Sequence, residues 1–216
     1  MTGPADDASS RPILHVVEDD EPTRRATARL LAAAGFDVRT YATADEFLAA
    51  PDPDRPGCII LDVRLPGRSG LDLQVALDRH VEPLPIIFLT GHADIPDTVR
   101  AIQRGAVDFL TKPVEGTVLL EAIGRALAQD ARSRAARGER RALRARYDRL
   151  TAREREVFVH LISGQLNKQV AADLAISERT IKLHRARIFE KLEVDSMAAL
   201  ARLAIALGID PAQGGK

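Results

Sequence analysis

Short hydrophobic runs alternate with longer amphipathic stretches from about residue 12 to residue 128. This alternation is typical of strands and helices that take turns around a parallel sheet. The runs predicted as strands are 13–17, 37–41, 58–61, 85–89 and 107–110, the second being the weakest. The stretches predicted as helices are about 22–34, 44–50, 70–79, 95–104 and 115–128. Five strands and five helices predict an α/β fold with a doubly wound, five-stranded parallel sheet.

After residue 150 the hydrophobic pattern is helical only. The residues predicted to cap four short helices are Thr151 with Glu154 in a T-x-x-E capping box, Asn167, Ser177 and Ser196. Such a pattern predicts a small all-α domain with a helix-turn-helix at its centre.

Residues 131–149 follow neither pattern and contain eight arginines and no β-branched residue. We predict a linker over 129–149 that is partly helical, because Ala and Arg are good helix formers, although Gly138 costs about 1 kcal/mol in a helix. The predicted organisation is a disordered N-terminus (1–11), an α/β domain (12–128), this linker and a helical domain (150–210).

The formal net charge of zero hides a division between the two parts of the chain. Residues 1–130 carry 13 Lys and Arg against 21 Asp and Glu, whereas residues 131–216 carry 18 against 10. This asymmetry predicts different partners for the two parts. The lone cysteine, Cys58, excludes an internal disulfide framework and a Cys-rich zinc site, and it is compatible with a reducing cytoplasm.

No run approaches the roughly 18–20 apolar residues that cross a bilayer, and the polar, acidic N-terminus does not resemble a secretory signal. We therefore expect a soluble, cytoplasmic protein with no membrane partner.

Polar groups follow four of the predicted strands. They are Glu18, Asp19 and Asp20 after the first strand, Asp62 after the third, Thr90 after the fourth and Lys112 after the fifth. Because parallel strands end at one edge of a sheet, these side chains are expected to converge. Carboxylates with no obvious protein counterion suggest a hard cation such as Mg²⁺. A carboxylate beside such an ion, with an amine and a hydroxyl opposite, can accept a phosphoryl group.

Each of these residues also has a simpler interpretation when it is taken alone. Asp20 before Pro22 is explained as a helix N-cap. Asp62 fits a turn, and Lys112 before Pro113 fits a solvated loop. Their occurrence together at four strand ends is what favours a functional site.

The third helix of the carboxyl-terminal part has two unlike faces. A step of about 100° per residue puts Ile181, Ile188 and Leu192 on one side. The other side is cationic, and such a helix can enter the major groove of DNA. Lys182 and Leu183 are predicted to face bases, whereas Arg179, Arg185 and Arg187 are predicted to lie nearer the DNA backbone. A solvated helix face is the alternative for each arginine.

Two further stretches have open interpretations. The arginine-rich linker is either a solvated spacer or a contact for the DNA backbone or a second subunit. The last helix repeats Leu200, Leu203, Ala204 and Leu207 as an apolar stripe. Burial in its own domain is the default, and a symmetric dimer contact is the alternative.

Several motifs resemble those of a known family. The stretches HVVEDDEP (15–22), ILDVRLPGRSG (60–70), FLTGH (88–92) and GAVDFLTKP (105–113) resemble the receiver domain of two-component response regulators. The run LTAREREVFVHLISGQLNKQVAADLAISERTIKLHRARIFEKL (150–192) resembles the LuxR-type DNA-binding domain. The pairing is similar to the FixJ-like branch, and the resemblance spans roughly residues 12–208.

The resemblance implies roles for individual residues. Asp62 would be the phosphoacceptor, Thr90 and Lys112 would bind phosphoryl oxygens, and Phe109 would be the aromatic switch residue. Mg²⁺ would be held by Asp19 and Asp62 directly, by Glu18 through water and by the backbone carbonyl of Arg64. Many relatives have Asp at the position of Glu18 and Tyr at that of Phe109. The Lys112–Pro113 peptide would be cis, which X–Pro bonds adopt at little cost.

The resemblance also implies partners and a mechanism. A sensor histidine kinase would phosphorylate Asp62, the face formed by the fourth helix and fifth strand would change shape, and the chain would form a homodimer on double-stranded promoter DNA with an inverted repeat. RNA polymerase is a further candidate partner. The chain would be a phosphoacceptor and not an enzyme, apart from weak self-catalysed phosphotransfer and dephosphorylation.

Two other functions fit parts of the sequence. One is a DNA-binding regulator that works without phosphorylation. The presence of Asp62, Thr90 and Lys112 together argues against this function. The other is a Mg²⁺-dependent phosphatase with an aspartyl nucleophile. Such enzymes typically need a second Asp two residues after the nucleophile, and Arg64 stands at that position.

Overall fold

The computed structural model describes residues 11–50, 55–78, 83–91 and 94–210. The chain forms two compact units, residues 1–133 and residues 134–216. The disordered N-terminus expected over residues 1–11 lies outside the described residues, apart from Arg11.

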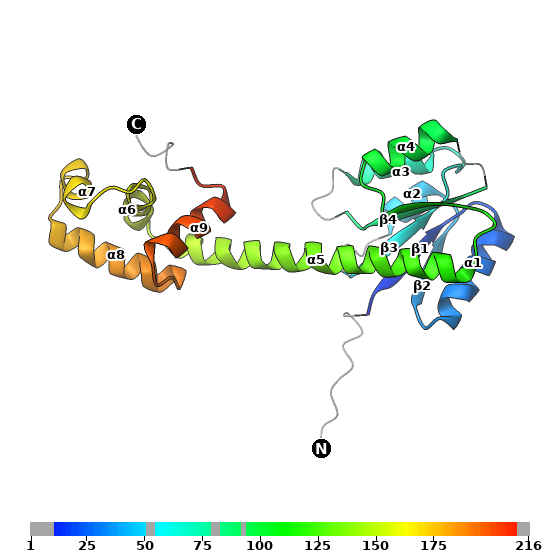
Figure 1. The fold of residues 1–216 in the computed structure, drawn as a ribbon, viewed down its shortest axis with the longest axis horizontal. Helices are drawn as coiled ribbons and strands as arrows, with labels where there is room; N and C mark the ends of the chain where they lie inside the picture. Colours follow the sequence, from blue (N-terminus) through cyan, green and yellow to red (C-terminus); the bar gives the residue numbers. More distant parts are fainter. Residues whose placement is uncertain (1–10, 51–54, 79–82, 92–93, 211–216) are drawn as a thin grey trace, which may run out of the picture. The chain divides into compact units, whose positions relative to one another are not determined.

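The first unit contains a five-stranded sheet in which every strand runs parallel to its neighbours. The strand order is β2-β1-β3-β4-β5 (Figure 1). The strands are β1 (Ile13–Val17), β2 (Asp37–Tyr41), β3 (Gly57–Leu61), β4 (Ile86–Thr90) and β5 (Asp108–Thr111). All five predicted strands are confirmed to within one residue at each end. The order reverses between β1 and β3, and the crevice at the carboxyl ends of those two strands is where sheets of this kind bind ligands.

Helices cover both faces of this sheet, as predicted for a doubly wound fold. They are α1 (Glu21–Ala33), α2 (Ala44–Ala49), α3 (Gly70–Leu77), α4 (Ile95–Gln103) and α5 (Gly116–Asp148). Helices α1 and α5 contribute to the core on one face, and α2, α3 and α4 contribute to the core on the other. Because β1, β3 and β4 are buried on both faces, their sequences are nearly continuous hydrophobic runs.

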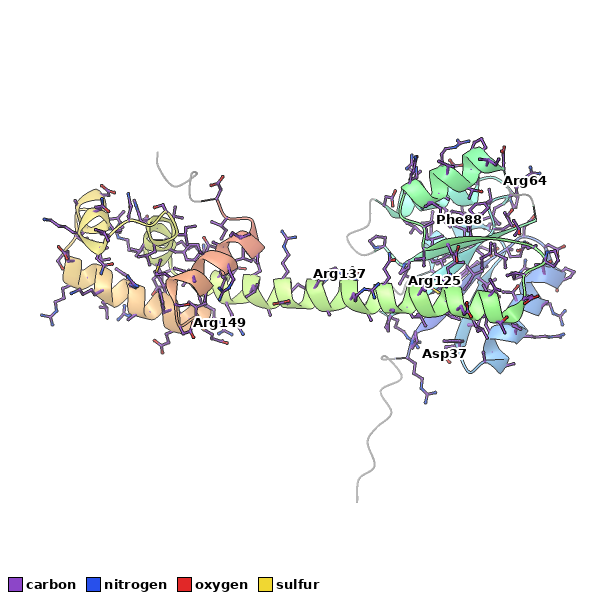
Figure 2. All side chains as sticks on the ribbon, in the orientation of Figure 1. Asp37, Arg64, Phe88, Arg125, Arg137 and Arg149 are labelled. Carbon is purple, nitrogen blue, oxygen red and sulfur yellow. The ribbon has the colours of Figure 1, made fainter. Side chains whose placement is uncertain are left out.

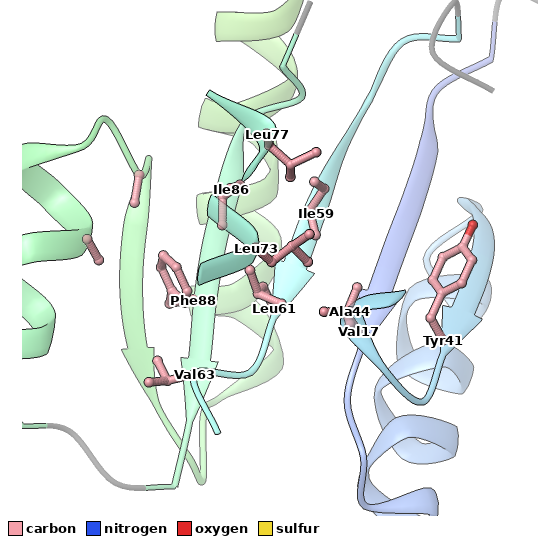
Figure 3. Packing of buried hydrophobic residues seen from close by; sticks show 12 residues of the cluster. Val17, Tyr41, Ala44, Ile59, Leu61, Val63, Leu73, Leu77, Ile86 and Phe88 are labelled. Carbon is pink, nitrogen blue, oxygen red and sulfur yellow. The ribbon is translucent and has the colours of Figure 1, made fainter. Parts of the chain in front are cut away.

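The core holds β3 in place along its length. Figure 3 shows Leu73 and Leu77 of α3 beside Ile59 and Leu61 of β3. All four side chains are buried. The end of β3 therefore has a fixed position, and Asp62 follows it directly.

Helix α1 begins as the sequence predicts. The Asp20 carboxylate accepts a hydrogen bond from the backbone N–H of Thr23 at 2.9 Å, and Pro22 lies in the first turn. The hydrogen bonds from Thr23 lower the pKa of Asp20, because they favour its charged form. The interpretation of Asp20 as a helix N-cap is confirmed.

Helix α5 continues through almost all of the predicted linker and ends at Asp148. Its buried residues all lie before residue 131, and residues 131–149 are exposed or half-buried. The last buried residue is Asp130, whose carboxylate accepts a hydrogen bond at 3.0 Å from the N–H of Gly57, the first residue of β3. This contact ties α5 to the sheet as far as Asp130.

The second unit adds four short helices to the end of α5, as predicted. They are α6 (Ala152–Ile162), α7 (Asn167–Asp173), α8 (Glu178–Leu192) and α9 (Met197–Leu207). Their buried side chains form one hydrophobic core, against which Leu143 and Tyr147 of α5 pack. The ring of Tyr147 meets the ring of buried Phe158 edge to face, with centroids 5.3 Å apart.

Three of the four predicted helix caps in this unit are confirmed. The capping side chains are those of Thr151, Ser177 and Ser196. The prediction for Asn167 is wrong, because Leu166 occupies the N-cap position and Asn167 is already helical. The Gln169 side chain accepts the Leu166 N–H at 2.8 Å, which closes the start of the helix without an Asn cap.

Glu154 completes the capping box of α6, and its buried carboxylate also forms an ion pair with the half-buried Lys191. Its carboxylate accepts hydrogen bonds from the Thr151 N–H at 2.8 Å and from the Lys191 ammonium at 2.6 Å. Burial alone would raise the pKa of Glu154, but the hydrogen bonds from Lys191 and Thr151 outweigh burial and lower it. A carboxyl whose pKa is lower in the folded chain stabilises it above the unfolded pKa, and this stability is lost as pH falls through the folded pKa.

We therefore expect Glu154→Gln to destabilise the second unit by about 1 kcal/mol at pH 7, with the difference from wild type shrinking at acid pH. Urea unfolding followed by circular dichroism, at neutral pH and at pH values below about 4, measures this difference. A difference that stays constant between the two pH values would contradict the role of the Glu154 charge.

Candidate functional site

Three carboxylates meet at the carboxyl ends of β1 and β3. Glu18 and Asp19 follow β1, and Asp62 follows β3, with its N–H donating to the Val17 carbonyl at 3.0 Å. One carboxylate oxygen of each of Glu18, Asp19 and Asp62 lies within 4.8 Å of the other two. Glu18 and Asp62 are buried, and Asp19 is exposed. The structure thus brings together three of the four acidic residues expected at these strand ends, whereas Asp20 caps α1 instead.

Lys112 reaches this cluster from the end of β5. Its ammonium donates a hydrogen bond to Asp62 at 2.6 Å and a second, shorter one to Glu18. The sequence suggests no protein counterion for these carboxylates, and that expectation is wrong, because Lys112 supplies one. The alternative of a solvated loop lysine is also wrong. The Lys112–Pro113 peptide is cis, as expected.

Burial and the neighbouring charges shift the pKa values of Glu18 and Lys112. Burial raises the pKa of Glu18, and the adjacent Lys112 ammonium only partly offsets this effect. Burial alone would lower the pKa of Lys112, but the carboxylates of Asp62 and Glu18 outweigh burial and raise it. The amine is therefore a cation at neutral pH, beside the oxygen that would react.

Thr90 lies on β4, the strand next to β3, and Phe109 lies on β5, the strand beyond it. Thr90 is the last residue of β4 and is buried, and its carbonyl accepts a hydrogen bond from the Lys112 N–H at 2.8 Å. Phe109 is half-buried on β5, with its ring 5.7 Å from the ring of Phe88. The Thr90 hydroxyl therefore comes from β4, and the Phe109 ring and the Lys112 amine come from the neighbouring β5 and the residue that follows it.

Two residues outside the predicted set also shape this site. The Arg24 guanidinium donates hydrogen bonds to the backbone carbonyls of Glu18, at 2.6 Å, and Asp19, at 3.0 Å. Gly70 begins α3 so close to Asp62 that a Cβ at Gly70 would stand 2.1 Å from the Asp62 carbonyl oxygen. Arginine in a helix has no local signal for this role, whereas the serine and glycine at the start of α3 form a recognisable helix start.

The donor set suits a hard divalent cation. Carboxylate oxygens from Glu18, Asp19 and Asp62 are the ligand type that Mg²⁺ prefers, and Mg²⁺ typically uses one or two carboxylates with additional water. The Arg64 N–H donates to the Asp62 carboxylate at 3.0 Å, and this bond holds the loop after β3 beside the cluster. The chemistry of these residues therefore fits the metal that the resemblance implies.

The cationic face of α8 is exposed in the second unit. Arg179, Lys182, Leu183 and Arg187 are exposed, while Arg185 is half-buried with its guanidinium 5.3 Å from the centre of the Phe189 ring. The opposite face is fully buried, as predicted, through Ile181, Ile188 and Leu192. Figure 2 shows the side chains along this helix. A helix with this division can lie in a groove of DNA without losing its packing.

Helix α9 buries most of its apolar stripe within its own unit. Leu200, Leu203 and Ala204 are buried and Leu207 is half-buried, so the default interpretation of this stripe is confirmed. Ile205 lies outside this stripe, and 78% of its surface is exposed. Among the described helices, none is long and apolar enough to span a membrane.

Comparison with known families matches both units. Residues 14–124 match the response regulator receiver domain, and residues 148–204 match the luxR family of bacterial regulatory proteins.

Individual relatives match the chain over most of its length. It is 43% identical over 203 residues to Nodulation protein W of Bradyrhizobium diazoefficiens, covering 94% of this chain and 89% of that protein. It is 39% identical over 198 residues to the transcriptional regulatory protein FixJ of Rhizobium meliloti, covering 92% and 97%. It is 42% identical over 193 residues to the response regulator protein TodT of Pseudomonas putida, covering 88% and 84%.

Solved structures match in the same way. The response regulator StyR aligns with a TM-score of 0.79 at 43% identity, over 91% of this chain and 99% of that chain. Full-length FixJ from B. japonicum aligns with a TM-score of 0.54 at 35% identity, over 93% and 99%.

Proposed function

The chain belongs to the two-component transcriptional response regulators that join a receiver domain to a LuxR-type DNA-binding domain, and on this premise we propose that Asp62 accepts the phosphoryl group. The observation that carries the proposal is the Lys112 ammonium, which contacts both Asp62 and Glu18 at the edge of the sheet. The donor is the phosphohistidine of a sensor histidine kinase. We place the receiver domain at 12–128 and the DNA-binding domain at 150–210.

The reaction is a transfer between two nucleophiles. A carboxylate oxygen of Asp62 attacks phosphorus, the bond from phosphorus to the donor imidazole breaks with its electron pair going to the ring nitrogen, and an acyl phosphate forms. The Lys112 ammonium and the Thr90 hydroxyl bind the phosphoryl oxygens, on which negative charge accumulates. The chain supplies the acceptor and positions it, so it is a phosphoacceptor with only weak self-catalysed phosphotransfer and dephosphorylation.

The metal partner in this proposal is Mg²⁺. Glu18, Asp19, Asp62 and the backbone carbonyl of Arg64 would hold it. When bound, Mg²⁺ neutralises charge on the phosphoryl oxygens.

Phosphorylation changes the surface through Thr90 and Phe109. The phosphoryl group adds charge and acceptor oxygens, the Thr90 hydroxyl moves toward them, and the Phe109 ring turns into the space that Thr90 leaves. The neighbouring helix α4 exposes Ile95, Val99 and Ile102 on its surface, with 79% of Ile95 accessible. We propose that this apolar face pairs with a second copy, which gives a homodimer on activation.

The DNA-binding domain then reads an inverted repeat in double-stranded promoter DNA. Lys182 and Leu183 face bases, and Arg179, Arg185 and Arg187 contact phosphates. The exposure of the cationic face of α8 supports these roles. Contact with RNA polymerase is a further part of the proposal.

Two alternatives make different predictions. A phosphorylation-independent regulator would bind DNA equally with and without a phosphodonor. An aspartyl-nucleophile phosphatase would turn over phosphate esters, but Arg64 stands where its acid-base carboxylate is needed.

The experiment that tests the proposed function compares the protein with and without a small phosphodonor and Mg²⁺. Analytical ultracentrifugation measures the mass, and selection from a random duplex pool measures sequence-specific DNA binding. We expect the phosphodonor to shift the mass toward a dimer and to increase enrichment of an inverted repeat. Equal mass and equal enrichment in both conditions would refute phosphorylation control.

A further inference from the structure

The part of α5 beyond Asp130 has a row of arginines on one side. We call Arg134, Arg137, Arg141 and Arg144 the arginine stripe. At about 100° per residue, these four positions lie within an arc of about 80°. Glu139 lies on the opposite side of the helix, and Asp148, at the end of α5, forms an ion pair with Arg144 at 3.2 Å. The stripe is therefore a strongly cationic face and not an even scatter of charge.

The stripe continues the face by which α5 packs on the sheet. The buried residues of α5 are Leu119, Ala122, Ile123, Ala126 and Asp130, and the same helical rotation places them in line with the stripe. From residue 131 onward this face is exposed or half-buried, and arginine replaces the apolar residues. A face that changes from apolar to cationic at this point no longer fits a protein core, but it suits a polyanion.

Other sides of the end of α5 join it to the DNA-binding unit. Leu143 and Tyr147 pack into the hydrophobic core of that unit. Arg146 and Arg149 form ion pairs with Glu193 at the end of α8, at 2.8 and 3.7 Å. The stripe and the DNA-reading helix α8 therefore belong to one compact unit. Figure 2 labels Arg137 in the stripe and Arg149 beyond it.

We propose that the arginine stripe binds phosphates of the DNA duplex next to the site that α8 reads, without sequence preference. This inference rests on the proposed DNA-binding function. Steps of three and four residues space the stripe at about 4.5 and 6 Å along the helix, against one phosphate per about 3.4 Å on each DNA strand. The guanidinium group suits phosphate recognition. A second copy of the stripe is disfavoured as the partner, because two cationic faces repel each other.

The test uses the full-length chain and a mixed-sequence duplex of about 30 base pairs, with affinity measured by fluorescence anisotropy between about 50 and 200 mM salt. The variant is Arg137→Gln with Arg141→Gln, since Gln keeps the helix propensity and removes the charge. We expect the slope of log K against log salt to become shallower by about 2, and the affinity to fall about tenfold at the lower salt.

Two matched variants separate the effect of the positive charge from the effect of the position on the helix. Arg137→Lys with Arg141→Lys keeps both charges and is expected to keep the slope. Arg132→Gln removes one arginine from another side of the same helix and is expected to leave the slope unchanged. Should the double Gln variant fail to fold, Arg141→Gln alone is expected to reduce the slope by about 1.

The outcomes distinguish this inference from the proposed function. A wild-type chain that binds the duplex neither alone nor with a small phosphodonor and Mg²⁺ would refute the DNA-binding function itself. Normal wild-type binding with an unchanged slope and affinity in the Gln variants would overturn only the role of the stripe. An unchanged slope with altered sedimentation would mean that the stripe contacts another protein surface, such as the acidic receiver of a second copy, and would also overturn it.

Discussion

Replacing Asp62 with Asn should abolish phosphorylation of this chain, with incorporation from a small phosphodonor and Mg²⁺ falling by at least about a thousandfold. The amide of Asn has nearly the shape of the carboxylate but lacks its nucleophilic oxygen. Because Asp62 lies at the end of a strand held by a buried core, the substitution leaves the surrounding fold in place. Intact-protein mass spectrometry measures the added phosphoryl group directly.

The matched control is Asp20→Asn. Asp20 is an exposed carboxylate in the segment between β1 and α1 that also carries Glu18 and Asp19, and it caps α1 by accepting the Thr23 N–H. Asn caps helices about as well as Asp, so phosphorylation should continue. Labelling that persists in Asp62→Asn would identify another acceptor, and equal loss in both variants would mean that the loop and not the nucleophile is required.

Replacing Phe158 with Ala should destabilise the second unit by about 3–5 kcal/mol. The Phe158 side chain is fully buried at the centre of that unit's core, and its ring also contacts the Tyr147 ring of α5. Removing it leaves a cavity between the helices, and DNA binding should be lost with the fold. Phosphorylation of Asp62 should remain, since Asp62 and its partners all lie in the first unit.

Urea unfolding of the full chain, with phosphorylation measured in parallel, tests this expectation. Leu183→Ala is the control for stability, because Leu183 is 51% exposed and a change there should cost no more than about 0.5 kcal/mol. Loss of phosphorylation together with DNA binding in the Phe158 variant would show that the two units do not fold independently.

The fold could be predicted almost completely from hydrophobic periodicity. Buried parallel strands are continuous apolar runs, so β1, β3 and β4 are visible in the sequence with few alternatives. The helix starts were equally clear where Ser, Thr or Asp supplies the cap. The exception is α7, where Asn167 looks like a cap but Gln169 closes the helix start from inside the helix. Asn favours a cap, but it does not determine which residue of a loop becomes the first of the helix.

The positions of the site residues could be predicted, but their contacts could not. Parallel strands end at one edge, so convergence of the acidic residues with Lys112 follows from the topology. Which amine pairs with which carboxylate depends on side-chain directions across three strands, and no spacing in the sequence encodes them. The same holds for Arg24, whose guanidinium reaches backbone carbonyls six and five residues earlier in the chain. The Asp130 contact with Gly57 joins positions 73 residues apart, a pairing that only the folded chain defines.

Gly70 has a consequence for judging whether a homologous gene is intact. At this position even a methyl group would collide with the backbone of Asp62, since its carbon would stand 2.1 Å from a carbonyl oxygen. A homologous sequence could keep every acidic residue, the threonine and the lysine but have alanine at the position of Gly70. Its polar residues would all match those of a functional receiver, yet the aspartate that corresponds to Asp62 would be displaced. A substitution at a residue that takes no part in the chemistry can thus prevent phosphorylation of the receiver.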